Sequence, residues 1–385
     1  MLSEPAIALQ APTNREPFRF FDNRQKYLLF VNTCSEKRVV AERIAAELPL
    51  LLPRPPALRI LDAGVGDGTV LTRVLRSMHG RFPNIPFYVV GKEISLEDVR
   101  LTLDKVSDRL ADHPGSVFVL TNMYYSEAPW LTAKSSSAAA STLWKEVALQ
   151  GKTAADFESQ ITELYPFLMQ NWRATASPKT GNPIYERPVV LVVYRDDQRF
   201  MLNDVIPSPG KTRADFDLII ASQPYRARTS AEFKAKSVVT PLTRALGPGG
   251  RLIAIQSCGD DPGMEIIEEM WPGERPFTTS RHDIMQAVRA ELGTQARKYT
   301  FVPHSNDRAV LRYALETLPD EVAGPIGTST SFAAWNAAVY VAQIADQKVA
   351  EAAADMRHHE VTNKILHKHN GLWFNDECFV IARQA

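Results

Sequence analysis

The clearest structural signal in this chain is the stretch Ile60-Leu-Asp-Ala-Gly-Val-Gly-Asp-Gly-Thr69. A short apolar run ends in three glycines at alternate positions, and a helical pattern begins at Thr69. Glycine lets the backbone turn sharply and approach a ligand closely, and the first N–H groups of the following helix can face that ligand. The stretch therefore predicts a strand, a turn and a helix that hold a nucleotide-like ligand. A tight turn without a ligand is the alternative interpretation.

Two common phosphate-binding patterns do not fit this turn. The dinucleotide pattern G-x-G-x-x-G/A is satisfied by Gly64 and Gly66, but its third position is Thr69. A Walker A loop ends in Gly-Lys-Ser/Thr, which is absent here. Instead an acid, Asp62, stands two residues before the first glycine, so a different nucleoside ligand is indicated.

Short apolar runs alternate with helical stretches on both sides of a long interruption. Strands that alternate with helices indicate crossover connections and a parallel sheet with covered faces. We expect strands at 59–63, 87–93, 117–120, 215–221, 251–256, 299–302 and 378–382, and helices at 69–78, 96–110, 231–246 and 283–292.

The alternation stops twice, and these interruptions define the expected organisation of the chain. In the first, a capping box at Thr153 and Asp156 starts a helix that Pro166 should kink or end, and 188–194 with 199–202 resemble a hairpin. We expect an N-terminal arm and helix (1–57, with 1–25 poorly ordered), a core (58–123, 214–304 and 371–385), an inserted cap with a helix and a hairpin (124–213), and a helical insertion (305–370).

The composition excludes several classes of protein. The 385 residues include 44 Lys and Arg and 44 Asp and Glu, so the formal net charge is zero. A polyanion-binding surface needs excess basic residues, and we expect no nucleic-acid partner. Cys34, Cys258 and Cys378 have no metal or redox spacing. We see neither a signal peptide nor a run of ~18 apolar residues, so we expect a cytoplasmic protein without membrane association.

The glycine turn resembles motif I of the class I S-adenosylmethionine-dependent methyltransferases, and the likeness continues along the chain. An acid ends their second strand and binds the ribose hydroxyls, and Glu93 holds that place here. The turn 246–250 is similar to the family's glycine-rich entry to the fifth strand. The resemblance implies a Rossmann-like α/β core, a mostly parallel seven-stranded sheet whose last strand is antiparallel, and S-adenosylmethionine as cofactor.

The same resemblance implies which residues contact the cofactor. Asn122 stands where the family commonly has an Asp that reads the adenine amino group, which an amide oxygen can also do. The aromatic segment 123–130 either packs over adenine or covers the core. The expected cofactor-binding residues are Asp62, Ala63, Gly64, Gly66, Asp67, Gly68, Glu93, Ile94, Asn122, Met123 and Ser222.

The end of the fourth core strand, Ser222-Gln-Pro-Tyr225, is similar to the acceptor loop of amino-group methyltransferases. In that loop a side-chain oxygen and a backbone carbonyl hold the acceptor N–H groups, and an aromatic ring stacks on the acceptor. The resemblance implies catalytic roles for Gln223 and Tyr225, and nitrogen slightly ahead of oxygen as the acceptor atom. A plain proline turn is the alternative. As a rim loop, the segment is expected to carry little of the core.

Methyl transfer needs a base only when the acceptor arrives protonated. Six of the eight histidines lie in the last third of the chain, without cysteines or paired carboxylates at ligand spacing, so we expect no metal. His304, just past an expected strand, is the candidate base. The helix around Trp335 either packs in the core or lines an acceptor pocket.

The sequence thus predicts a methyltransferase that acts on a small molecule, because two insertions near the strand ends would form a cap that excludes water. A protein or nucleic-acid methyltransferase is one alternative. A non-catalytic S-adenosylmethionine-binding partner subunit is another. The oligomeric state and the acceptor are not specified by the sequence.

Overall fold

The computed structural model describes residues 24–178, 181–316, 328–354 and 356–385. Most of the arm expected at 1–25 lies outside these residues, and its last two residues begin the first helix, α1 (Arg24–Thr33). Among the described residues, none of the helices has the length and apolar character needed to cross a bilayer.

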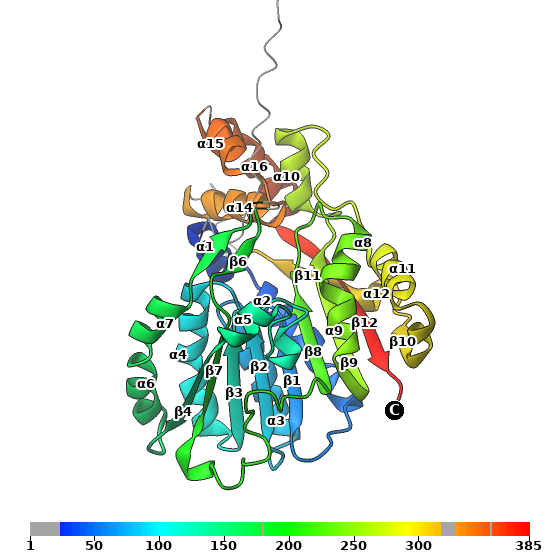
Figure 1. Ribbon diagram of the computed structural model, residues 1–385. Helices are drawn as coiled ribbons and strands as arrows, with labels where there is room; N and C mark the ends of the chain where they lie inside the picture. The colour runs from blue at the N-terminus through cyan, green and yellow to red at the C-terminus, as the bar shows by residue number, and fades with distance from the viewer. Residues whose placement is uncertain (1–23, 179–180, 317–327, 355) are drawn as a thin grey trace, which may run out of the picture.

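One ten-stranded sheet organises the molecule (Figure 1) in the order β10-β12-β9-β8-β1-β2-β3-β7-β4, with β11 paired to β12 off this path. A separate small hairpin is made by β5 and β6. The strands are β1 (Leu58–Asp62), β2 (Phe87–Lys92), β3 (Ser116–Thr121), β4 (Leu143–Leu149), β5 (Ala174–Ala176), β6 (Pro183–Tyr185), β7 (Val189–Arg195), β8 (Phe216–Ser222), β9 (Leu246–Ser257), β10 (Tyr299–Val302), β11 (Val310–Ala314) and β12 (Trp373–Arg383).

The central strands confirm the expected Rossmann-like core. β3, β2, β1, β8 and β9 are parallel neighbours, and β12 is antiparallel to β9. The strand order reverses at β1: from β1 the chain continues to β2 and β3 on one side and later to β8 and β9 on the other. Ligands of open α/β sheets bind at such a point. The expected number of seven strands is too low, because β4, β7 and β11 join the same sheet.

Helices cover both faces of the sheet, and the upper helices lie beyond its carboxyl edge. The first face carries α2 (Glu36–Ala45), α3 (Thr69–Arg81) and α4 (Leu96–Asp112), and the second carries α8 (Ala231–Lys234), the π-helix η4 (Ala235–Val239), α9 (Thr240–Arg244) and α11 (Arg281–Leu292). The upper helices are α10 (Pro262–Met270), α14 (Thr328–Val341), α15 (Asp346–Ala353) and α16 (Arg357–His369). The short helices are η1 (Leu48–Leu50), η2 (Ala128–Trp130), α5 (Ser136–Ala140), η3 (Asp196–Gln198), η5 (Gly293–Lys298) and α12 (Asn306–Ala309).

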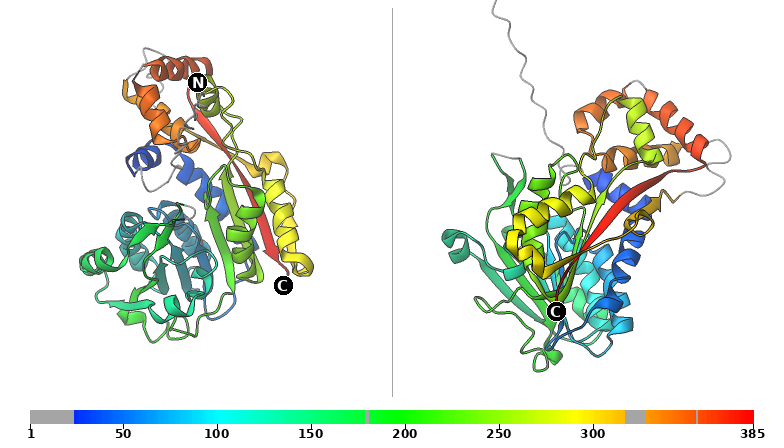
Figure 2. Two further views of the ribbon diagram at one scale, coloured as in Figure 1. Left: turned by 45° about the horizontal axis from the view of Figure 1, so that its top comes forward. Right: turned by 90° about the vertical axis from the view of Figure 1, so that its right-hand side faces the viewer.

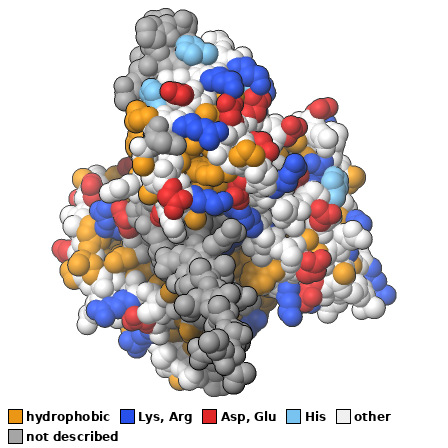
Figure 3. Space-filling view, turned by 90° about the horizontal axis from the view of Figure 1, so that it is seen from above, with side chains coloured by type: hydrophobic (Ala, Val, Ile, Leu, Met, Phe, Trp, Pro, Cys, Tyr) orange, Lys and Arg blue, Asp and Glu red, His pale blue; other side chains and the backbone are white. Residues whose placement is uncertain are grey.

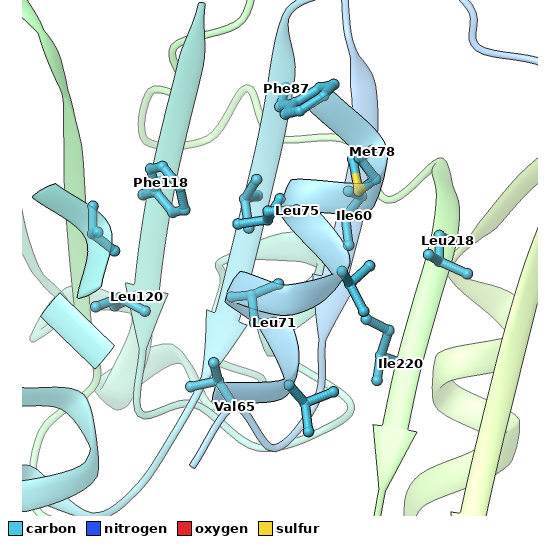
Figure 4. Close-up of a cluster of buried hydrophobic side chains, with 14 of the residues drawn as sticks. Ile60, Val65, Leu71, Leu75, Met78, Phe87, Phe118, Leu120, Leu218 and Ile220 are labelled. Atoms are coloured by element: carbon cyan, nitrogen blue, oxygen red, sulfur yellow. The ribbon is translucent and has the colours of Figure 1, made fainter. Parts of the chain in front are cut away.

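The first face is held by apolar packing between the sheet and α3 (Figure 4). Ile60 and Leu218 of neighbouring strands lie under Leu71, Leu75 and Met78 of the helix, and all five side chains are buried. Each fully buried side chain of this size contributes about 1.5–3 kcal/mol relative to exposure. This packing fixes where β1 ends and α3 begins, and so it fixes the glycine turn between them.

The first insertion is built differently from the expected cap with a hairpin. Its capping box at Thr153 and Asp156 is confirmed, and the helix ends early, since Pro166 starts a new helix: α6 (Ala154–Thr162) is followed by α7 (Tyr165–Asn171). The hairpin prediction is wrong. β7 pairs antiparallel with β3 and parallel with β4, so both of its edges are filled and 199–202 finds no strand partner.

The second insertion, expected to be largely helical, also contains a strand. β11 pairs with the first half of β12 through the register Val310↔Glu377 to Ala314↔Trp373. The second half of β12 pairs with β9 and β10. Figure 2 shows this long strand running from the upper helices down along the sheet. The upper helices are therefore tied to the core by one continuous strand.

Candidate functional site

A cavity of about 700 Å³ lies at the carboxyl ends of β1, β2 and β8. Its walls come from the glycine turn, the end of β2, the loops after β3 and β8, and parts of α1, α2, η4, β11 and α14. Small-molecule sites commonly occupy about 300–1,000 Å³. The cavity therefore has the place and the size expected for a ligand site of an open α/β sheet.

Left-handed backbone gives the glycine turn its shape. Gly66 has φ +54° and Gly68 has φ +79°, a region that favours glycine. A Cβ on Gly66 would lie 3.0 Å from the Tyr27 hydroxyl oxygen, and one on Gly68 would lie 2.9 Å from Thr102 Oγ1. The Thr102 hydroxyl donates to the Gly66 carbonyl at 2.8 Å. The turn is thus closely backed by side chains and tolerates no larger residue.

The Glu93 carboxylate organises the space beside this turn. Its Oε2 accepts from the Gly66 N–H at 3.0 Å, and its Oε1 accepts from the N–H groups of Ile94 and Ser95 at 2.7 and 2.9 Å. Oε2 keeps a lone pair for a further donor. The Trp172 indole N–H donates to the Glu93 carbonyl at 3.1 Å, so the first insertion is fastened to the site.

Two more acids stand on the same side of the cavity, and their pKa values shift in opposite directions. Burial raises the pKa of Asp62 to about 7, which the hydrogen bond from the Gly64 N–H opposes. Burial also acts to raise the pKa of Asp67, but the hydrogen bond from Thr69 and the Lys105 ammonium outweigh it and lower that pKa. A ligand with positive charge would favour the ionised form of both groups.

The loop after β8 brings Ser222, Gln223 and Tyr225 to the cavity wall, as the sequence predicts. Gln223 has φ +49°, and its amide is held by Ser257: Oε1 accepts from the Ser257 N–H at 3.2 Å, and Nε2 donates to Oγ at 3.0 Å. The Tyr225 ring is only 8% exposed and packs in the core beneath the cavity, with the Lys234 ammonium 4.9 Å from its centre. The loop therefore carries more of the core than a rim loop would.

The structure does not bring His304 to the cavity. The last residue of β10 pairs with Val380 of β12. The cavity lies further along β12, because its wall includes Ser257, which pairs with Asp376. His304 Nδ1 lies 3.5 Å from an Arg43 guanidinium nitrogen and borders a separate hollow. Within the described ranges, no three His, Cys, Asp or Glu residues are grouped to hold a metal ion.

Of the eleven expected cofactor contacts, eight line the cavity. These are Asp62, Gly64, Gly66, Asp67, Glu93, Ile94, Asn122 and Ser222. Among the described residues, the lining does not include Ala63 and Met123, which are buried in the second-face core, or Gly68, which caps α3. The Asn122 amide holds the start of β7: its oxygen accepts from the Val189 N–H and its nitrogen donates to the Arg187 carbonyl, each at 2.8 Å.

Several lining residues were not among the expected site residues. They are Tyr27, Lys37, Lys92 and Tyr313. Long-range packing places most of them, since α1 lies against α14 and β11 pairs with β12.

Each of the two segments with open alternatives serves both purposes. In 123–130, Tyr124 and Tyr125 line the cavity, whereas Met123 and Ala128 are buried in the second-face core. In the helix around Trp335, that residue is buried in the core of the upper helices, whereas Tyr340 lines the cavity.

No family model and no curated protein matches this chain. Solved structures are similar over much of its length. They include a sarcosine dimethylglycine methyltransferase from Galdieria sulphuraria, an assignment given as provisional (8% identity, 89% of this chain and 85% of that chain, TM-score 0.36). Geranyl diphosphate methyltransferase in complex with its substrate and sinefungin is another (12%, 90% and 77%, 0.29).

A third similar structure is a provisionally assigned class I S-adenosylmethionine-dependent methyltransferase from Listeria monocytogenes. The identity is 10% and the TM-score 0.29, with 69% of this chain covered. Our chain spans only about half the length of that protein, 52%. At these identities and scores the likenesses assign no activity, and we infer the function from the residues of the cavity.

Proposed function

We propose that this chain is an S-adenosylmethionine-dependent methyltransferase that acts on a small-molecule acceptor. The observation that carries the proposal is the glycine turn with two left-handed residues, Gly66 and Gly68, which faces a cavity beside the Glu93 carboxylate. A turn that only connected β1 to α3 would need neither the cavity nor the buried acids around it.

The residues present fit this cofactor. The Gly64 and Gly66 backbone would lie against it, and Glu93 Oε2 has the free lone pair that a ribose hydroxyl requires. Buried acids gather on this side of the cavity and suit a ligand that carries a sulfonium and an ammonium charge. They are Glu36, Asp62, Asp67 and Asp98.

When bound, the sulfonium supplies a methyl group as an electrophile. The chain's own contribution is to place the acceptor in line and to exclude water. The first insertion supports this role, since Asn182, Pro183 and Ile184 of the β5–β6 hairpin line the cavity. Tyr340 and Gln343 at the end of α14 close it from the other side.

A small acceptor is favoured over a polymer. The cavity has the size of a metabolite site, and the face above it mixes positive and negative side chains rather than presenting a single basic field (Figure 3). A protein or nucleic-acid methyltransferase needs an open surface for its substrate and is the weaker candidate.

Calorimetric titration with S-adenosylmethionine and S-adenosylhomocysteine tests the cofactor assignment. We expect both to bind at one site. Incubation with metabolite extracts and methyl-labelled cofactor then tests catalysis, with heat-inactivated protein as the control. Absence of binding would refute the proposal, and binding without label transfer to any acceptor would indicate the non-catalytic partner subunit.

A further inference from the structure

The two oxygen atoms with which the loop after β8 could hold an acceptor N–H group are already engaged. The Gln223 side-chain oxygen accepts from the Ser257 N–H at 3.2 Å. The Pro224 carbonyl accepts from the Tyr125 hydroxyl at 2.6 Å. Each oxygen keeps a second lone pair, so an acceptor amine could share these atoms but would not be their first partner. The loop therefore gives nitrogen no particular advantage over oxygen.

The orientation of the Gln223 amide follows from its partner. A backbone N–H can only donate, so the oxygen of the amide must face the Ser257 N–H, and the nitrogen must face away from it. The nitrogen donates one hydrogen to Ser257 Oγ at 3.0 Å. Its other N–H acts with Ser257 on the buried Asp376 carboxylate, and these hydrogen bonds oppose the burial that raises the pKa of that acid. The Gln223 amide is thus engaged inside the protein, although the residue lines the cavity.

Two hydroxyl groups of the same wall lack partners. Ser222 Oγ and the Tyr225 hydroxyl oxygen are buried, and neither makes a hydrogen bond to any described residue. Buried polar groups of native proteins are almost always paired, with protein, water or ligand. Both residues belong to the cavity wall, although the two oxygen atoms themselves are covered in the free protein.

A cation faces the same part of the cavity. Lys92 lines the cavity. Its ammonium makes no ion pair and no hydrogen bond with the part of the chain that the structure describes. The ammonium nitrogen lies 4.8 Å from the centre of the Tyr125 ring. The carboxylate of the adjacent Glu93 accepts hydrogen bonds from three backbone N–H groups. Burial lowers the pKa of Lys92, against the opposing charge of Glu93. An ammonium in this setting calls for an anion from outside the chain.

We propose that the reacting end of the methyl acceptor is an oxyanion, a carboxylate or a phenolate, paired with Lys92 beside the Ser222–Tyr225 loop. This inference rests on the proposed function and names its substrate class. The acceptor oxygen forms the new bond to the methyl carbon, the carbon–sulfur bond breaks, and its electron pair stays on sulfur. No proton moves, so the absence of His304 from the cavity is of no consequence.

The rest of the acceptor is apolar or aromatic. Beyond Lys92, this half of the cavity is lined by the side chains of Tyr125, Tyr225, Phe233, Val238 and Pro241. Flat or aliphatic groups pack well on such side chains, and aromatic walls favour aromatic ligands. Small aryl carboxylates and phenols are therefore suitable probes.

The test is calorimetric titration of the wild-type protein, saturated with S-adenosylhomocysteine, with benzoate, salicylate and benzylamine. We expect the two anions to bind and benzylamine to bind at least about tenfold more weakly, because an ammonium would meet Lys92 at close range. This comparison needs no variant. Failure of both anions to bind, or equal affinity for benzylamine, would overturn the inference.

Variants then assign the effect to Lys92. Lys92→Met should weaken anion binding by about tenfold or more, since a hydrogen bond to a charged group is lost, and Lys92→Arg should retain most of it. Lys152→Met, at an exposed lysine before α6, is the matched control and should change nothing. Anion affinity that Lys92→Met leaves intact would contradict the proposed pairing.

The assigned cofactor and the assigned acceptor class are tested separately by these titrations. If the wild-type protein does not bind S-adenosylhomocysteine, the proposed function is refuted. Retained S-adenosylhomocysteine binding without selectivity for oxyanions refutes only the acceptor class. S-adenosylhomocysteine affinity in Lys92→Met should stay within about twofold of wild type, because Lys92 is assigned to the acceptor and not to the cofactor.

Discussion

Glu93 Oε2 accepts a hydrogen bond from the Gly66 N–H at 3.0 Å, and this single contact joins the end of β2 to the glycine turn after β1. The ribose-binding acid and the close-approach glycine are therefore parts of one unit. A change in either residue should disturb the other, and the first two predictions concern this pair.

Gly66→Val should abolish measurable binding of S-adenosylmethionine. The left-handed φ of +54° strains a branched residue, and the new Cβ would lie 3.0 Å from the Tyr27 hydroxyl. Calorimetry measures the affinity, and circular dichroism checks the fold.

The control is Gly80→Ala in α3, where an added Cβ meets nothing within 4 Å. This change should raise stability by up to about 1 kcal/mol through helix propensity and leave cofactor affinity unchanged. Normal affinity in Gly66→Val would show that the turn does not contact the cofactor.

Glu93→Gln should weaken S-adenosylmethionine binding by about 1.5–3 kcal/mol, the range for hydrogen bonds to a charged group. The amide nitrogen would also face one of the N–H groups of Gly66, Ile94 or Ser95, so thermal stability should fall as well. Glu163→Gln, at an exposed site after α6, is the control for charge removal. Unaltered affinity would rule out a ribose contact.

The affinity for S-adenosylmethionine should rise with pH up to about 7 and then level off. Burial raises the pKa of Asp62 to about 7, so below that pH the free protein holds the group protonated, and a cationic ligand must expel the proton. The limiting slope is about tenfold per pH unit. Titrations at several pH values should show this slope in the wild type and a flatter profile in Asp62→Asn.

The stability of the free protein gives a second readout for Asp62. Because its folded pKa lies above the unfolded value of about 3.9, folding takes up a proton between these values, and stability falls as pH rises through that window. Asp62→Asn should therefore stabilise the free protein at pH 8 but not at pH 4. A stabilisation that does not vary with pH would argue against the raised pKa.

Tyr225→Phe should lower turnover while cofactor affinity stays near wild type. The change removes a buried hydroxyl that has no partner among the described residues, so the melting temperature should hold or rise. Truncation to alanine is a poor test, because the ring is only 8% exposed and its loss would cost about 3–5 kcal/mol of stability. Turnover equal to wild type in Tyr225→Phe would remove the residue from the acceptor site.

The control for this experiment is Tyr194→Phe. Tyr194, on β7, is also buried, and its hydroxyl donates to Glu146 at 2.6 Å. This variant should lose about 1 kcal/mol of stability and retain full turnover. The two variants together separate a role in the acceptor site from a general requirement for buried tyrosines.

The parallel core was predictable from the sequence, because its strands are buried on both faces and read as continuous apolar runs. β4 was not predictable, since Leu-Trp-Lys-Glu-Val-Ala-Leu carries no clear period and becomes a strand only through its pairing with β7. The second arm of the expected hairpin, 199–202, does not become a strand, because both edges of β7 are already paired.

The site was predictable where it lies on the core strands and not elsewhere. Gly64, Gly66 and Glu93 follow from local sequence, because a turn between a strand and a helix fixes their positions. Lys92 was not predictable, because successive side chains of a strand point to opposite faces of the sheet. Next to Glu93, Lys92 should therefore point to the other face, where the sequence indicates no ligand. Only the insertion, which brings Tyr125 over Lys92, extends the cavity to it.

The edges of the widened sheet bear on the behaviour of the protein in concentrated solution. An unpaired strand can recruit a second copy and seed aggregates, unless it is short or carries charge. β10 is only four residues long, and the Arg289 guanidinium lies 4.4 Å from the centre of its Phe301 ring. At the opposite edge, β4 carries Lys145 and Glu146 in its middle. Without β7 and β4, the uniformly buried β3 would form this edge of the sheet. The first insertion places a charged strand there instead, and we expect this to reduce self-association.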